Sequence, residues 1–65
     1  MKIQINGENA IIDSTNIAQL MVELNYDVDA VATALNGDFV AIFQRADAAL
    51  NENDRLEIVA PMQGG

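Results

Sequence analysis

Polar and apolar residues alternate at the start of the chain. Residues 2–6 read Lys-Ile-Gln-Ile-Asn, and a period of two predicts a strand with one buried face. Asn6-Gly7 ends this segment, and both residue types tolerate the positive φ angles of a type I′ turn. We therefore predict a hairpin whose second strand returns through residues 10–12. Whether Ile11 or Ile12 faces the core depends on the register, because a shift of one residue exchanges the two faces of a strand.

A helical period follows the hairpin. Apolar residues recur at positions i, i+3, i+4 and i+7, which is typical of a helix that packs with one face; they are Ile17, Leu20, Met21 and Leu24. Asn16 is expected to cap the first turn, with Gln19 completing a capping box. Asn25 is expected to end the helix, because asparagine readily adopts the left-handed conformation. Residues 26–29 then predict a solvated loop.

The second half of the chain returns to the strand pattern. Residues 31–35 predict a strand that carries Ala32 and Ala34 on one face and larger residues on the other. Asn36-Gly37 predicts a second hairpin, which leads into a short strand near residues 39–41.

Less regular sequence separates this hairpin from the last strand. Residues 43–50 show no clear period and predict at most one helical turn, and residues 51–54 predict a polar turn. Residues 55–60 alternate again and predict the final strand. Pro61 is suited to end that strand, because it has no N–H group to donate.

Together these elements predict an α+β fold. One helix covers only one face of a sheet, so we expect a mixed sheet of four to five strands with the helix packed on one face. The final strand should lie parallel to the first, because the helix has carried the chain across the sheet. The expected core consists of Ile3, Ile5, Leu20, Leu24, Leu56 and Ile58. On the uncovered face we expect an apolar patch that docks a partner, formed by Ala32, Ala34, Val59 and Met62.

Composition excludes several classes of function. The 65 residues include no Cys and no His, so thiolate chemistry and the usual general base at neutral pH are absent. We therefore expect no catalytic residue, no metal and no stably bound cofactor. The formal net charge of -7 argues against nucleic acid as a partner and favours a basic protein surface. No apolar run is long enough to span a membrane, so we expect a cytoplasmic protein with no membrane partner.

The composition of the last five residues predicts a tail that is separate from the folded domain. Gln63 is followed by Gly64 and Gly65, and nothing after Pro61 has the apolar area to hold the chain against a core. We therefore expect residues 1–60 to form one domain and residues 61–65 to form a flexible tail. The tail would present a narrow backbone that ends in a carboxylate.

These features resemble a known family, the ubiquitin-like β-grasp sulfur carriers, and within it the carriers of thiamine (thiazole) biosynthesis. The resemblance covers all 65 residues. It rests on residues 3–8, 17–24, 31–37, 53–59 and 63–65. The chain also departs from the family pattern. These carriers often show a Pro-Arg pair and then an aromatic residue after the fourth strand, where this chain has Ala41-Ile42 and then Arg45; Asn53 stands where Gly is common.

The resemblance implies a protein cosubstrate rather than an enzyme. A partner adenylating enzyme would use ATP to activate the Gly65 carboxylate, and a sulfur donor would convert the adenylate to a thiocarboxylate. Thiazole synthase would then accept the sulfur. Gln63, Gly64 and Gly65 would enter a channel of the partner, because a backbone without Cβ atoms fits a slot that other residues would block.

Three other functions fit parts of the same pattern. A sulfur carrier for molybdopterin synthesis would end in the same way, although such chains are usually longer. A ubiquitin-like modifier would be joined to target lysines through Gly65; the chain's only lysine is Lys2, which leaves little scope for chains of modifiers. A plain β-grasp binding module would use the apolar patch and not the glycines.

Overall fold

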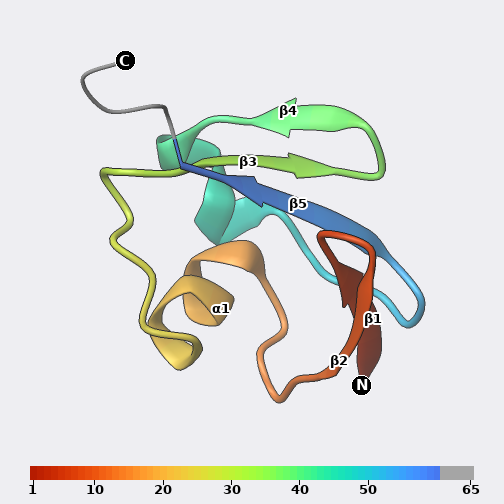
Figure 1. The fold of residues 1–65 in the computed structure, drawn as a ribbon. Helices are drawn as coiled ribbons and strands as arrows, with labels where there is room; N and C mark the ends of the chain where they lie inside the picture. Colours follow the sequence, from red (N-terminus) through yellow and green to blue (C-terminus); the bar gives the residue numbers. More distant parts are fainter. Residues whose placement is uncertain (61–65) are drawn as a thin grey trace.

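Five strands form one mixed sheet in the order β2-β1-β5-β3-β4 (Figure 1). The structure is a computed structural model and describes residues 1–60. Its elements are β1 (Lys2–Ile5), β2 (Glu8–Ile11), α1 (Ile17–Glu23), β3 (Ala32–Leu35), β4 (Asp38–Val40), the 3₁₀ helix η1 (Ile42–Asp47) and β5 (Arg55–Val59). No helix in this part of the chain is long and apolar enough to cross a membrane.

The last strand lies in the middle of the sheet. β5 runs parallel to β1, with Ile5 beside Leu56, and antiparallel to β3, with Leu35 beside Leu56 and Thr33 beside Ile58. The prediction that the final strand lies inside the sheet and parallel to the first is therefore confirmed. Because β5 joins the two hairpins, every other strand depends on it directly or through one neighbour.

Both hairpins turn at an Asn-Gly pair, as predicted. Asn6 and Asn36 each have a φ of 52°, and the glycines that follow have φ angles of 84° and 90°. In the first hairpin Ile3 lies opposite Ala10, which directs Ile11 away from the core. Ile12, just past the end of β2, is buried instead.

Asn16 caps α1 as predicted, since its Oδ1 accepts a hydrogen bond from the Gln19 N–H at 2.8 Å. The capping box is only half formed, because the Gln19 side chain accepts from the N–H of Thr15 rather than from that of Asn16. The assignment of Leu24 to the core is wrong: this residue is 38% exposed. The helix already ends at Glu23, and the chain turns away where Asn25 has a φ of 60°.

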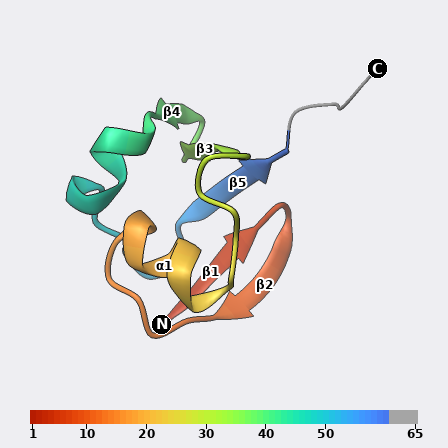
Figure 2. The same ribbon diagram turned by 90° about the vertical axis from the view of Figure 1, so that its left-hand side faces the viewer.

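The core lies between the sheet and one covering layer. Its buried apolar residues come from the sheet, from α1 and from the connections; they are Ile3, Ile12, Ile17, Leu20, Met21, Leu50, Leu56 and Ile58. Ile5, which was assigned to the core, is only partly buried at its margin. Figure 2 shows α1 and η1 on the same side of the sheet, with α1 nearer β1 and η1 nearer β3 and β4. The expectation of at most one helical turn after residue 42 falls short of the six-residue η1.

Candidate functional site

The uncovered face of the sheet carries an apolar patch near the end of β5. The strand register sets Ala32 beside Val59 and Ala34 beside Phe39, and paired residues share one face of a sheet. Val59 is 57% exposed and Phe39 is 70% exposed. Three residues predicted for a docking surface, Ala32, Ala34 and Val59, are thus on one face. We call these three residues with Phe39 the outer patch.

Phe39 is the member of the outer patch that the sequence analysis missed. The signal was present in the second hairpin: a two-residue Asn36-Gly37 turn pairs Leu35 with Asp38 and therefore Ala34 with Phe39. Counting outward from the turn would have placed Phe39 on the same face as Ala34.

A hollow of about 220 Å³ borders the outer patch where β5 ends. It is lined by Ala30, Val31, Ala32 and Val59, with Asp29 as the one charged residue. Val59 is the last residue of β5, so this hollow lies at the end of the final strand. Met62, Gln63, Gly64 and Gly65 lie outside the described residues, so their predicted roles stay predictions.

The wall of this hollow is held from inside by a buried arginine. Arg45 of η1 is 2% exposed, and its guanidinium donates to the carbonyl oxygen of Val28 at 2.9 Å and to that of Val31 at 2.7 Å. Its Nε also donates to Thr33 Oγ1 at 3.1 Å. The guanidinium therefore fixes the loop that leads into β3. The hydropathy pattern of the sequence did not predict that Arg45 would hold this loop.

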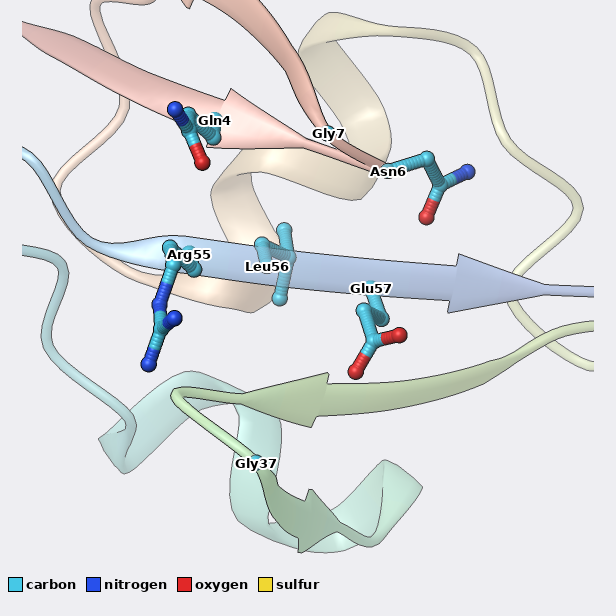
Figure 3. A pocket seen from close by; sticks show the side chains of 7 residues that line it. All are labelled: Gln4, Asn6, Gly7, Gly37, Arg55, Leu56 and Glu57. Carbon is cyan, nitrogen blue, oxygen red and sulfur yellow. The ribbon is translucent and has the colours of Figure 1, made fainter.

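A second hollow lies over the centre of β5 (Figure 3). It encloses about 320 Å³ and is lined by Gln4, Asn6, Gly7, Gly37, Arg55, Leu56 and Glu57. The figure shows polar side chains of β1 and β5 above the sheet, between the two Asn-Gly turns. A single cation, a single carboxylate and amide groups line it, and this set includes no nucleophile paired with a base.

The described residues offer little chemistry of their own. Across residues 1–60 no group of three or more acidic side chains is placed to hold a metal ion. Charge near the outer patch is acidic, because Asp29 lines the first hollow and Glu57 lies beside Ala34. The exposed apolar residues and their acidic neighbours are an arrangement that suits contact with a partner.

Comparison with protein families gives a direct match. The family model described as the ThiS family matches residues 3–65. The chain belongs to the ThiS family.

Two curated relatives of this ThiS family chain differ in size. The sulfur carrier protein ThiS of Thermus thermophilus is 29% identical, and the match covers 97% of the chain and 98% of that protein. A thiazole synthase of Paramagnetospirillum magneticum is 39% identical over the whole chain, but the chain spans only 20% of that protein's length.

A solved structure shows the same fold. The chain is similar to the crystal structure of a thiamine biosynthesis protein (ThiS) from Geobacter metallireducens, with a TM-score of 0.86 and 23% sequence identity. The structural match covers the whole of both chains. The ThiS family chain described here therefore has the ubiquitin-like β-grasp fold that was predicted for it.

Proposed function

We propose that this chain is the sulfur carrier of thiamine thiazole biosynthesis, a cytoplasmic protein that serves other enzymes as a cosubstrate. The observation that carries the proposal is the ThiS family match, which runs through Gly65. The full-length match to the sulfur carrier protein ThiS of Thermus thermophilus supports it. The absence of Cys and His from the sequence is consistent with it, because a carrier that holds sulfur on its terminal carbonyl needs no reactive side chain.

In this proposal the chemistry takes place at Gly65. A carboxylate is a poor acyl donor, so an adenylating enzyme first joins a carboxylate oxygen to the α-phosphorus of ATP and releases pyrophosphate. A hydrosulfide ion supplied by a sulfur donor then attacks the carbonyl carbon, displaces AMP and loses its proton. Gly65 is left with a thiocarboxylate, and no oxidation or reduction is needed. The carrier supplies no acid or base at either step; it positions the reacting group.

The outer patch is the surface that we propose for docking. It combines exposed apolar residues with acidic neighbours, so a partner should present apolar groups within a basic surround. It also adjoins the start of the tail, so one docking event would place the tail at the partner's catalytic site. Thiazole synthase is the acceptor that we propose, and the Paramagnetospirillum thiazole synthase supports this choice because it contains a segment similar to the whole chain.

Intact mass spectrometry tests the carrier role. Incubation with an adenylating enzyme, ATP and a sulfur donor should raise the mass by roughly 16 Da, because sulfur replaces one oxygen. A chain without Gly65 should gain no mass, since its carboxylate is withdrawn by one residue, about 3.3 Å. A much larger product would instead indicate a modifier. Sulfur transfer by a chain without both glycines would disprove the carrier role and leave a binding module.

Val59→Asp tests the docking surface. The change should weaken binding to the adenylating enzyme by at least about tenfold, because it buries a charge in an apolar contact. Ile11→Asp is the matched control: Ile11 is also an exposed apolar strand residue, and its pairing with Lys2 places it at the far edge of the sheet, on β2. Equal affinities for the two variants would rule out the outer patch.

A further inference from the structure

The end of β5 extends past the strand that should support it. β1 pairs with β5 only as far as Ile5 beside Leu56, and the chain then leaves the sheet at Asn6-Gly7. β5 continues to Val59. The N–H and C=O of Ile58 therefore face a place where β1 has no backbone to offer.

The side chain of Asn6 fills this place. Its Oδ1 accepts a hydrogen bond from the Ile58 N–H at 2.8 Å, and its Nδ2 donates to the Ile58 carbonyl oxygen at 3.0 Å. The Asn6 backbone N–H also donates to the carbonyl oxygen of Leu56 at 2.9 Å. One residue thus continues the parallel ladder for a further step, as its position at the end of β1 in Figure 3 shows. On the opposite edge of β5, Val59 pairs with Ala32 of β3.

The other Asn-Gly turn makes the same kind of contact at the other end of β5. The Asn36 backbone N–H donates to the Arg55 carbonyl oxygen at 2.7 Å, and Asn36 Oδ1 accepts from the Arg55 N–H at 2.9 Å. Both asparagines have a φ of 52°. The two side chains therefore share their turn geometry and their target strand, and they differ in which end of β5 they hold.

We propose that Asn6 is a positioning residue that fixes where β5 ends and where the tail begins. This inference rests on the proposed function, because it matters only if the tail must be delivered to a partner. With Asn6 in place, both edges of β5 are hydrogen-bonded as far as Ile58, and Val59 is held in the outer patch. Without it, the end of β5 is held at its β3 edge alone, and a docking partner must order that end at an entropic cost. The turn itself does not require an asparagine side chain, since glycine also adopts the positive φ.

Asn6→Gly and Asn36→Gly form the matched pair that tests this role. Both keep the turn conformation and remove one side chain that bonds to β5. In the full chain, Asn6→Gly should speed amide exchange at Ile58, and Asn36→Gly should speed exchange at Arg55 but not at Ile58. With the adenylating enzyme, Asn6→Gly should raise the KM for the carrier about tenfold, the equivalent of roughly one net hydrogen bond, with kcat within about twofold. Asn36→Gly should change neither constant.

The possible outcomes separate the two proposals. Wild-type chain that is never adenylated overturns the proposed function and this inference with it. Adenylation of the wild type with an unchanged KM for Asn6→Gly overturns this inference alone. An equal rise for both variants does the same, because it would reflect general destabilisation. Should Asn6→Gly fail to fold, Asn6→Asp replaces it: the acceptor for the Ile58 N–H remains, the donor to the Ile58 carbonyl is lost, and the same rise in KM is expected.

Discussion

The two helical segments that cover the sheet stabilise the fold by different means. α1 contributes three buried residues, all apolar: Ile17, Leu20 and Met21. η1 contributes one buried residue, and it is the arginine Arg45. Under β1 the covering layer is held by hydrophobic burial, which is not directional. Next to β3 and β4 it is held by hydrogen bonds from one guanidinium, which demand fixed positions of their acceptors.

The exposed side of η1 is apolar although its buried residue is charged. Along η1, the apolar residues Ile42 and Phe43 face the solvent while Arg45 is buried. This reverses the ordinary distribution, because a buried charge is costly unless its donors are satisfied. Each nitrogen of the guanidinium has an oxygen acceptor. A small domain can therefore complete its core with a polar side chain where a loop offers enough carbonyl groups as acceptors.

The largest effect is expected in β5, which joins two halves of the domain. We call β1 and β2 with α1 the α1 half, and β3 and β4 with η1 the η1 half. Leu56 of β5 is buried between the two hairpins, so Leu56→Ala should lower the free energy of unfolding by about 2–5 kcal/mol. That loss is a large share of the total stability of a small domain. Chemical denaturation followed by circular dichroism would measure it. Val59→Ala on the same strand but facing outward is the control, with an expected change within about 0.5 kcal/mol. Similar losses for the two variants would contradict the assigned core.

The next effect should separate the η1 half from the α1 half. Arg45→Lys keeps the charge but replaces a planar group of fixed donors by one ammonium, which cannot reach the acceptors on Val28, Val31 and Thr33 together. We expect a loss of roughly 1.5–3 kcal/mol in unfolding free energy. Amide exchange should show the opening near Val31 and leave α1 protected.

Arg55→Lys is the control for this variant, because Arg55 is exposed. Its change should stay within about 0.5 kcal/mol. If Arg45→Lys were equally mild, the guanidinium would not be what holds the loop before β3.

The same contrast explains how far the sequence could predict the structure. α1 was predicted from its apolar stripe and both hairpins from their Asn-Gly turns, which are local signals with one physical solution. The central place of β5 followed from the order of elements. Leu24 was misplaced because its stripe runs one residue past the end of α1. η1 itself could not be predicted, because hydropathy would bury Phe43 and expose Arg45. The reverse arrangement is stabilised by the carbonyl groups of Val28 and Val31, which are distant from Arg45 in sequence.

Only part of the candidate site could be predicted from the sequence. Ala32, Ala34 and Val59 follow from strand alternation once one face is covered. Phe39 required the register of the second hairpin, and the role of Asn6 required knowing that β5 runs past the end of β1. The hairpin register has a local signal in the Asn36-Gly37 turn, whereas the pairing of β5 with β1 joins distant segments and leaves no local pattern.

The smallest expected effect is the pH dependence of stability that arises at the end of α1. Glu23, in the last turn of α1, accepts hydrogen bonds from the Ser14 hydroxyl and from the backbone N–H groups of Asp13 and Ser14. The Ser14 hydroxyl first, and then the Asp13 N–H, lower the pKa of Glu23 below its ordinary value of 4.5. Because the pKa of Glu23 is lowered in the folded state, its contribution to stability is complete above the unfolded value of 4.5. The contribution decreases as the pH falls from that value through the folded pKa, because the unfolded chain then binds the proton more readily.

Glu23→Gln should therefore reduce stability at about pH 7 and matter progressively less as the pH falls well below 4.5. Urea denaturation of the wild type and the variant across this range would show the two curves converging. The exposed Glu8→Gln, at the start of β2, is the control and should stay parallel to the wild type. The hydrogen bonds of the Arg45 guanidinium go to two carbonyl oxygens and one hydroxyl and to no carboxylate. The η1 half should consequently keep its amide protection at acid pH, whereas the connection between β2 and α1 should lose its own. Simultaneous loss in both halves would mean that the two covering segments do not respond independently to pH.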